Sequence, residues 1–267
     1  MNIINKSFGK KIIFDDAQFE INSNCILIIG ENGSGKTTLM KILAGLIKSY
    51  TGECSVKDNS SLLLDSNVLY LSKSGTENID LFLNETEKMK AIYLINLFQM
   101  EDYIDKRCFF YSNGMKKKLS LVIALAKDKR YLLLDEPTNS LDSKSIQILK
   151  NYLLEEKKNR VIIIASHDMQ IFDKDLIDEI FMIENNKIYS KNLNDYDYEY
   201  YRIKTNDEII SSNYEFVKNG DDYIFKINKG ELVNFSKEIC KYVILEMNML
   251  KPYDEYCLKE LYKWKHN

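Results

Sequence analysis

A glycine-rich segment carries the strongest chemical signal in this chain of 267 residues. The segment, Gly30–Thr38, has the pattern GxxxxGK[ST] and follows the apolar run Ile26–Ile29. Glycines at this spacing let backbone amides point at a phosphate, and a helix that begins at the lysine adds its positive end. The alternative, a glycine turn with a chance Lys-Thr pair, does not explain the flanking strand and helix. We therefore predict a nucleotide-phosphate site lined by Asn32, Gly33, Ser34, Gly35, Lys36, Thr37 and Thr38.

Two acids at the end of a second apolar run extend this chemistry. The run Tyr131–Leu134 leads directly into Asp135 and Glu136. Parallel sheets place ligand-binding groups at the carboxyl ends of their strands. We predict that Lys36 bridges the β- and γ-phosphates and that Thr37 and Asp135 hold Mg²⁺. Glu136 is expected to orient or deprotonate the attacking water. Taken without the glycine-rich loop, the two acids would be interpreted as a solvated strand end.

The composition limits the function classes open to the chain. Lys and Arg number 37 and Asp and Glu number 40, so the net charge is −3 and a chain-wide basic face for nucleic acid is not expected. The five cysteines are scattered and form no CxxC pair, which argues against a metal site or a disulfide framework. No apolar run approaches the roughly 18 residues that span a bilayer. We therefore expect a cytosolic protein without its own membrane passage.

The pattern of apolar residues in the rest of the sequence predicts the strands and helices that position these residues. Apolar runs alternate with helical patterns over residues 1–189, which predicts an α/β fold with a largely parallel central sheet. The pair Asn185 and Asn186 lies between two apolar runs and predicts a hairpin turn, because asparagine tolerates a positive φ. The expected strands are Cys25–Ile29, Val68–Leu71, Tyr131–Leu134 and Val161–Ala165, and the expected helices are Thr37–Ile47, Met115–Ala126 and Ser145–Glu156.

A change in composition near Ser190 predicts a domain boundary. Ten of the 18 tyrosines lie between Tyr196 and Tyr262. We therefore divide the chain into one domain at 1–189 and a second at 190–267. The second domain carries no chemical motif. Its expected elements are a strand at Tyr223–Ile227 and helices at Ser236–Met247 and Tyr253–Trp264.

Together these motifs resemble the ATP-binding-cassette (ABC) ATPases, the nucleotide-binding subunits of ABC transporters. The resemblance covers about residues 1–190. It implies a P-loop NTPase fold with a helical subdomain at about 74–128, which includes the segment Glu85–Met100, and a small α/β C-terminal accessory domain. It also implies ATP and Mg²⁺ as cofactors, and ATP hydrolysis as the reaction.

The same resemblance assigns roles to five further residues. Phe8 stands where the family stacks an aromatic ring on adenine, although a hairpin core position is the other interpretation. Ser112 and Gly114 stand in the family's signature segment and would bind the ATP held by an opposite subunit. Asp142 would hydrogen-bond across that dimer; without the resemblance it would be interpreted as a helix cap. His167 matches the switch histidine that contacts the γ-phosphate.

Two segments depart from the family's pattern. The signature reads Tyr111-Ser112-Asn113-Gly114-Met115, a version that resembles the cassettes of some peptide and bacteriocin exporters. Lys73 stands where the family has a glutamine that contacts Mg²⁺ or the attacking water. An ammonium cannot ligate Mg²⁺. Either coupling at this loop is altered, or the true position lies a residue or two away.

These features predict an ATPase that drives export of a substrate, such as a peptide, bacteriocin or antibiotic. It would act as a homodimer, or as a heterodimer with another cassette, on separate integral-membrane permease subunits at the inner face of the cell membrane. A soluble or regulatory ABC-type ATPase with slow hydrolysis is the alternative. A kinase or GTPase is a further rival, but the guanine-reading Asn-Lys-x-Asp pattern is absent from the sequence.

Overall fold

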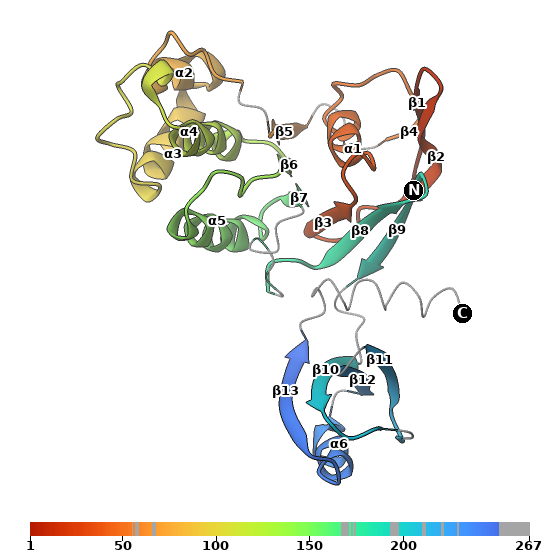
Figure 1. The fold of residues 1–267 in the computed structure, drawn as a ribbon. Coiled ribbons are helices and arrows are strands. Elements are labelled where there is room, and N and C mark those ends of the chain that lie inside the picture. Colours follow the sequence, from red (N-terminus) through yellow and green to blue (C-terminus); the bar gives the residue numbers. More distant parts are fainter. Residues whose placement is uncertain are drawn as a thin grey trace. The chain divides into compact units, whose positions relative to one another are not determined.

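The computed structural model divides the chain into two compact units, Met1–Asn192 and Leu193–Asn267 (Figure 1). The boundary that we predicted from composition, between residues 189 and 190, lies three residues earlier. Each unit has its own core, and the two are described separately below. The residues that the structure describes are 1–54, 56, 59–65, 68–166, 171, 173, 175–192, 198–209, 212–219, 222–228 and 230–250.

A six-stranded sheet forms the centre of the first unit, in the order β5-β6-β7-β3-β8-β9. The first five strands are parallel and β9 is antiparallel. The middle strands are apolar and buried almost throughout, because helices cover both faces of the sheet. The predicted parallel α/β fold is therefore confirmed. The strands are β3 (Cys25–Gly30), β5 (Ser60–Leu63), β6 (Tyr131–Asp135), β7 (Val161–Ala165), β8 (Glu179–Glu184) and β9 (Lys187–Asn192).

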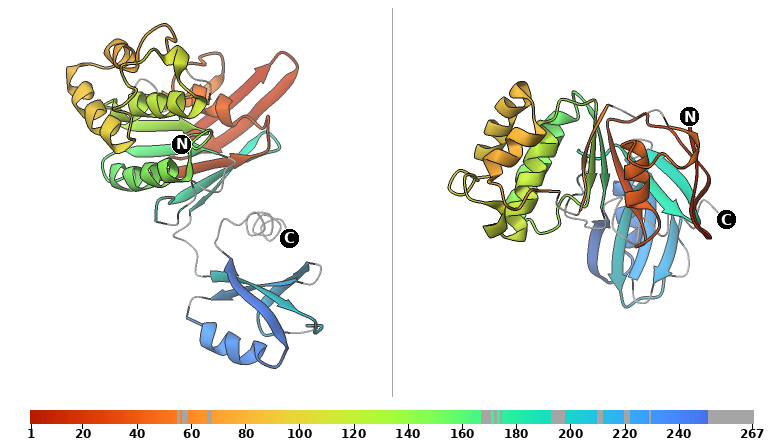
Figure 2. Two further views of the ribbon diagram at one scale, coloured as in Figure 1. Left: turned by 60° about the vertical axis from the view of Figure 1, so that its left-hand side comes forward. Right: turned by 90° about the horizontal axis from the view of Figure 1, so that it is seen from above.

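Helix α1 (Lys36–Leu43) lies on one face of this sheet, and α4 (Asn113–Ala126) and α5 (Ser143–Glu156) lie on the other (Figure 2). A second, antiparallel sheet packs against α1 and has the order β2-β1-β4. One core cluster joins both sheets through α1 and contains Phe14, Phe19 and Phe181, all buried. This packing holds α1 in place after the loop that follows β3. The second sheet consists of β1 (Asn2–Phe8), β2 (Lys11–Phe19) and β4 (Thr51–Glu53).

The hairpin predicted around Asn185 and Asn186 is confirmed. Both residues have positive φ, 47° and 63°, between the antiparallel strands β8 and β9. The Asn186 amide also donates to the carbonyls of Ile12 and Ile13, at 2.8 and 3.1 Å. The turn thereby holds β2 of the second sheet against the central sheet.

Helices α2 (Gly75–Phe82) and α3 (Glu85–Leu97), the short helix η1 (Cys108–Phe110) and α4 form a helical subdomain at the side of the sheet (Figure 1). Ser74 and Asn84 cap α2 and α3 in reciprocal capping boxes with Glu77 and Glu87. These caps fix where both helices begin. The helical segment predicted at Glu85–Met100 is present but ends three residues earlier, at Leu97.

The predicted strand at Val68–Leu71 is wrong. This segment is not a strand, and Val68, Tyr70 and Leu71 are 65%, 56% and 43% exposed. The strand beside β6 is instead β5 (Ser60–Leu63). Two serines break the apolar pattern of β5, and Ser61 is buried at little cost because its hydroxyl donates to the Ala124 carbonyl at 2.7 Å.

The second unit contains a four-stranded antiparallel sheet, β11-β12-β10-β13, and one described helix. Phe225, Phe235 and Tyr223 form the centre of its core. The predicted helix at Ser236–Met247 is wrong beyond Ile239, because Ile244–Leu250 pairs with β10 as a strand. The predicted helix at Tyr253–Trp264 lies outside the described residues. The elements are β10 (Tyr198–Thr205), β11 (Glu215–Asn219), β12 (Asp222–Asn228), α6 (Leu232–Ile239) and β13 (Ile244–Leu250).

Arg160 joins the end of α4 to the start of β7, and we expect its loss to weaken the first unit. Its guanidinium donates to the carbonyls of Leu125 and Lys127, at 2.9 and 3.0 Å, and pairs with Glu156. Arg160→Met leaves these buried groups without their donor, so the free energy of unfolding should fall by about 2–4 kcal/mol. The urea midpoint measures this. Lys158→Met removes an exposed ion pair and should change stability by less than about 0.5 kcal/mol. Equal midpoints for the two variants would contradict the expectation.

Candidate functional site

A pocket of about 490 Å³ lies where β3 leads into α1 and where β6 ends. It gathers side chains from four separate segments of the sequence. All of the predicted phosphate-loop residues except Ser34 line it, together with Phe8, Asp135 and Glu136. The complete lining is Phe8, Lys11, Ile13, Asn32, Gly33, Gly35, Lys36, Thr37, Thr38, Asp65, Asp135, Glu136 and Asn139.

The loop between β3 and α1 has the backbone shape of an anion cradle. Gly33 and Gly35 have φ of +81° and +116°, a region that disfavours other residues. A Cβ on Gly35 would also lie 2.7 Å from Cγ2 of Ile13. No side chain caps the amino end of α1. The first amides of this helix therefore point into the loop without a side-chain acceptor, as a phosphate site requires.

Lys36 is held inside this loop. Its ammonium donates to the carbonyls of Gly30 and Glu31, at 2.6 and 3.1 Å, and the residue is only 7% exposed. Burial lowers the pKa of Lys36, and the carboxylates of Glu136 and Asp135 oppose that shift. A buried ammonium among backbone carbonyls and two carboxylates is suited to phosphate oxygens.

Thr37 and Asp135 form the part of the pocket that fits a magnesium ion. The Thr37 hydroxyl donates to Oδ2 of Asp135 at 2.8 Å. The other carboxylate oxygen, Oδ1, is buried and has no hydrogen-bond partner among the described residues. Burial raises the pKa of Asp135, and the nearby Glu136 and Asp65 carboxylates add to the rise, while the Thr37 hydrogen bond opposes it. An unpaired carboxylate oxygen beside a hydroxyl is a hard-oxygen donor set that a divalent cation would satisfy.

The protein by itself does not complete a metal site here. In the described part of the chain, no three His, Cys, Asp or Glu side chains are close enough together to hold a metal ion. Mg²⁺ in nucleotide sites is usually held by one or two protein groups, with phosphate oxygens and waters completing the shell. The donor set of Thr37 and Asp135 therefore fits a magnesium ion that arrives with a nucleotide.

Glu136 occupies a constrained backbone position at the end of β6. Its φ is +47°, which is unusual for a residue with a side chain. The Glu136 amide donates to the Ala165 carbonyl at 2.7 Å, and the Ser166 hydroxyl donates to Oε2 at 3.0 Å. Both contacts come from β7 or the residue that follows it. They direct a 9%-exposed carboxylate into the pocket. His167, the predicted γ-phosphate contact, lies outside the described residues.

Phe8 lies at the edge of the pocket and is 50% exposed. The interpretation of Phe8 as a hairpin core residue is therefore wrong. The Lys6 ammonium lies 4.3 Å from the centroid of the Phe8 ring. This cation supports the ring from one side, while the exposed remainder of the side chain is free for a flat ligand such as a purine base.

Ser112, Gly114 and Asp142 do not line the pocket. Ser112 caps α4, where its hydroxyl accepts from the Met115 amide at 3.2 Å. A Cβ on Gly114 would lie 2.8 Å from the Ser140 carbonyl oxygen, so the signature segment and the loop before α5 are in close contact. Asp142 caps α5 by accepting from Ser145 at 2.7 Å. The structure thus groups these predicted residues on a separate surface of the first unit.

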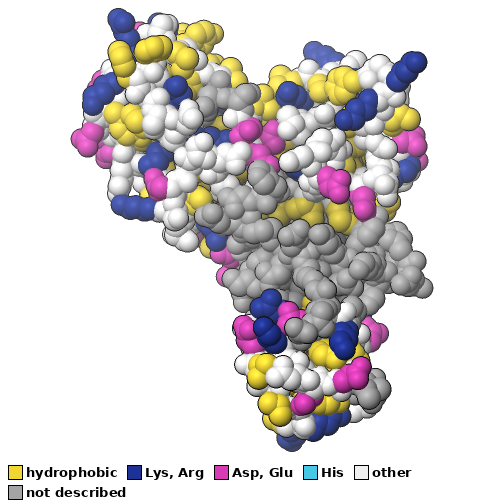
Figure 3. All heavy atoms as spheres, viewed as in Figure 1, with side chains coloured by type: hydrophobic (Ala, Val, Ile, Leu, Met, Phe, Trp, Pro, Cys, Tyr) yellow, Lys and Arg dark blue, Asp and Glu magenta, His cyan; other side chains and the backbone are white. Residues whose placement is uncertain are grey.

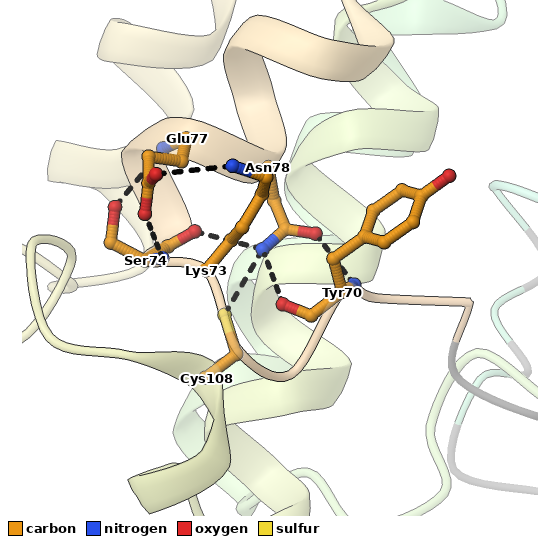
Figure 4. Close-up of polar contacts among 6 residues, drawn as sticks. All are labelled: Tyr70, Lys73, Ser74, Glu77, Asn78 and Cys108. Atoms are coloured by element: carbon orange, nitrogen blue, oxygen red, sulfur yellow. Dashed lines mark hydrogen bonds and ion pairs between the residues drawn. The ribbon is translucent and has the colours of Figure 1, made fainter.

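Lys73 belongs to the helical subdomain and does not line the pocket. Figure 4 shows its side chain beside Glu77, with which it pairs at 3.2 Å. The buried Asn78 holds the neighbouring backbone: it accepts from the Tyr70 amide at 2.9 Å and donates to the carbonyls of Tyr70 and Ser74. The segment before Lys73 is the exposed Val68–Leu71, which is not the strand that we predicted there.

Sequence reasoning missed Asp65, which lines the pocket two residues after β5 ends. Its Oδ1 accepts from the amide of Asn139 at 2.9 Å. A signal for it exists: Leu62–Asp65 and Leu132–Asp135 both read Leu-Leu-Leu-Asp. The two strands pair in parallel, so their acids reach the same edge of the sheet. Ser60 and Ser61 interrupt the apolar pattern before Leu62–Asp65, so this segment was not predicted as a strand that ends in an acid.

Several known proteins are similar to this chain in sequence. The family model described as "ABC transporter" matches residues 14–139. The ABC transporter ATP-binding protein NatA of Bacillus subtilis is 30% identical over 181 residues, which cover 60% of this chain and 73% of NatA. The ABC transporter ATP-binding protein YhcH of the same organism, described as uncharacterized, is 25% identical and the match covers 94% of this chain and 88% of YhcH. The aliphatic sulfonates import ATP-binding protein SsuB 1 of Shouchella clausii is 27% identical, with 87% and 94% covered.

Solved structures share the fold. An ATP-binding subunit of an ABC transporter superposes with a TM-score of 0.65 at 21% identity, over 73% of this chain and 90% of that one. A dimeric bacterial ABC transporter cassette superposes with a TM-score of 0.62 at 18% identity, over 72% and 97%. None of the helices in the described part of this chain combines the length and apolar character needed to cross a bilayer.

Proposed function

Because this chain belongs to the family of ABC transporter ATP-binding proteins, we propose that its pocket binds ATP with Mg²⁺ and that two cassettes close around the nucleotides. ATP binding and ATP hydrolysis coupled to transport are properties of this family, and the chain is the ATP-binding component of a transporter. The observation that carries the magnesium assignment is the unpaired Oδ1 of Asp135 beside the Thr37 hydroxyl.

Separate residues of the pocket bind the phosphates, hold the metal ion, activate the water and stack on the base. Lys36 and the first amides of α1 bind the phosphates, and Thr37 and Asp135 hold the metal ion, which neutralises charge that builds up on the phosphates. Glu136 orients the attacking water and accepts its proton. The Ser166 hydroxyl holds its carboxylate in place, and the Ala165 carbonyl of β7 holds its backbone amide. His167 contacts the γ-phosphate. Phe8 stacks on the adenine ring.

The surface formed by Ser112, Gly114 and Asp142 supplies the second half of the site. Ser112 and Asp142 are exposed and lie outside the pocket of their own chain. We assign this surface to the ATP held by a second cassette, in a homodimer or in a heterodimer with another cassette. The helix start capped by Ser112 offers backbone amides to an anion there. The dimeric form of a structurally similar cassette supports this arrangement.

Mass measurement by light scattering after gel filtration tests the dimer. A slow-hydrolysing preparation, Glu136→Gln with ATP and Mg²⁺, is expected to shift from the 31.3 kDa monomer to twice that mass. Adding Ser112→Arg places a bulky side chain in the contact and should return the protein to the monomer, because the second cassette can then no longer approach the nucleotide. Adding Asn159→Arg, at an exposed turn after α5, should leave the dimer intact. A monomer in all three preparations would contradict the arrangement.

Separate permease subunits in the cell membrane are the proposed partners, with this chain bound at their cytoplasmic face. Exposed apolar side chains gather over the helical subdomain (Figure 3), among them Leu81, Met89 and Phe110, which are 53%, 71% and 72% exposed. A pocket of about 320 Å³ between this subdomain and β5 is lined in part by Val68 and Phe82. Such a surface suits an apolar helical segment of a permease.

Export of a peptide, bacteriocin or antibiotic is the direction that we propose, on the basis of the Asn113-Gly114-Met115 version of the signature. Import of a small anion is the second candidate, because SsuB 1, named as an import protein, matches over 94% of its length. A strain that lacks this chain distinguishes them. Sensitivity to peptide antibiotics supports export, whereas loss of growth on an aliphatic sulfonate as sulfur source supports import.

A regulatory ATPase with slow hydrolysis is the alternative to a subunit that drives transport. Tight ATP-dependent dimerisation, combined with hydrolysis that a purified permease does not accelerate, would favour it. Faster ATP hydrolysis in the presence of the permease in vesicles would favour a subunit that drives transport.

A further inference from the structure

The second unit leaves part of one sheet face uncovered. Its strands lie in the order β11-β12-β10-β13, so β13 forms an edge of the sheet (Figure 1). Helix α6 packs on the two inner strands, where Phe235 contacts the rings of Tyr201 and Phe225. Four strands about 4.8 Å apart present a face about 19 Å wide, whereas a helix with its side chains is about 10–12 Å across. One helix therefore does not cover the whole face.

Met247 lies on the uncovered part of this face. It stands directly opposite Ile203 of β10, a fully buried core residue, and directly opposed residues of paired strands point to the same face. Met247 is nevertheless 38% exposed, and the nearby Leu245 is 53% exposed. The opposite face of β13 is polar, because Asn248 stands opposite Arg202 there. The strand thus has the alternating pattern of a half-buried strand, but its apolar side is open.

The chain continues directly from β13 into residues 251–267, hereafter the C-terminal segment. This segment lies outside the described residues, and its sequence predicts a helix over Tyr253–Trp264. Pro252 has no amide hydrogen for a strand ladder and suits the first turn of a helix. Asp254 and Glu255 stand in that first turn and Lys263 in the last, as the helix dipole favours. Apolar side chains recur every three or four residues on one face of this helix: Tyr253, Cys257, Leu261 and Trp264.

The length and the starting point of the C-terminal segment match the uncovered strand. A helix of about 12 residues is about 18 Å long, and a strand of the length of β13 is about 23 Å long. The segment leaves β13 at Leu250, so Lys251 and Pro252 supply the connection that turns it back along the strand. A segment tethered this closely has an effective concentration in the millimolar range, which favours it over a second chain.

We propose that the C-terminal segment folds back as a helix beside α6, and that its apolar stripe covers Leu245 and Met247. The second unit then has a layer of two helices on the apolar face of a four-stranded sheet. This inference goes beyond the proposed function and requires no nucleotide in the pocket of the first unit.

The single tryptophan of the chain, Trp264, reports on the covered face. In the full chain, its emission should be shifted to the blue and its quenching by acrylamide should be much weaker than in the urea-unfolded chain. Hydrogen exchange of the amides of residues 251–267, followed by mass spectrometry, measures how often the segment opens. Met247→Asp removes one buried apolar contact and should speed this exchange about tenfold to a hundredfold.

Matched controls introduce the same aspartate on the other face of each element. Asn248→Asp, on the polar face of β13, should leave the exchange of the segment unchanged. Within the segment, Leu261→Asp should speed exchange as Met247→Asp does, whereas Lys259→Asp, outside the apolar stripe, should not. Circular dichroism and the melting temperature show that each variant is folded. Leu261→Asp keeps the test decisive if Met247→Asp unfolds the sheet.

Four results would overturn the inference, and each leaves the proposed ATP site standing. Trp264 is quenched in the native chain as strongly as in urea; or Leu261→Asp and Lys259→Asp have equal effects on exchange. Protection that increases with protein concentration would assign the face to a second copy of the chain. A blue shift that requires vesicles of anionic lipid would assign the segment to a membrane surface.

Discussion

Replacing Glu136 with glutamine is expected to reduce steady-state ATP hydrolysis by about a thousandfold while leaving ATP binding nearly unchanged. A positioned general base contributes roughly 10²–10⁴ in rate, and the amide cannot accept a proton. The shape of the side chain is kept, and the replaced oxygen position still lies 3.0 Å from the Ser166 hydroxyl. The φ of +47° belongs to the backbone, so the substitution preserves the position of the residue as well.

The rate of phosphate release measures hydrolysis, and titration with a fluorescent ATP analogue measures nucleotide binding. Glu155→Gln is the matched control, because Glu155 carries the same carboxylate at a 71%-exposed position on α5, where it pairs with Lys158. That variant should hydrolyse ATP at the wild-type rate. If Glu136→Gln retained steady-state hydrolysis within a fewfold of the wild type, another group would be the base. Loss of both binding and hydrolysis would assign Glu136 to the nucleotide pocket rather than to the water.

Replacing Lys36 with methionine is expected to weaken ATP binding by about a hundredfold. Charge-assisted hydrogen bonds contribute roughly 1.5–3 kcal/mol each, and we propose that the ammonium contacts two phosphate groups. Methionine keeps the unbranched stem at the start of α1 but removes every donor. The carbonyls of Gly30 and Glu31 then face the phosphates without a cation between them, which adds repulsion to the loss of attraction.

Calorimetric titration with ATP and Mg²⁺ gives the affinities. Lys41→Met, in the last turn of the same helix, is the control and should bind ATP as the wild type does. An affinity within twofold of the wild type in Lys36→Met would show that the loop amides alone bind the triphosphate. An equal loss for Lys41→Met would show that net charge, rather than the position of Lys36, governs binding.

The phosphate loop and the acids of β6 could be predicted from the sequence, because they depend on contiguous residues. Gly33, Gly35 and Lys36 act through a local backbone shape, and a single apolar strand delivers Asp135 and Glu136. Motifs that consist of adjacent residues can be recognised without knowledge of the tertiary structure. The parallel sheet follows for the same reason, since strands buried on both faces are continuous apolar runs.

Elements whose identity depends on distant partners were predicted less well. Ser60–Leu63 is a strand because β6 pairs with it and because Ala124 accepts from its buried serine. Ile244–Leu250 has helix-forming residues, but pairing with β10 makes it a strand. Composition and periodicity do not show which distant segment a strand pairs with. The sequence pattern therefore favoured a strand at Val68–Leu71 and a helix that continues from Ser236 to Met247.

The sequence by itself predicted an ABC-type ATPase, because the phosphate loop, the acids after Leu134 and the signature segment each consist of adjacent residues. Tertiary structure alone decided that Asp65, rather than Lys73, lies in the pocket. It also decided that Ser112 and Asp142 lie outside the pocket of their own chain. The physical reason is that strand register and helix packing bring residues together over 50 positions or more, and no local pattern carries that information.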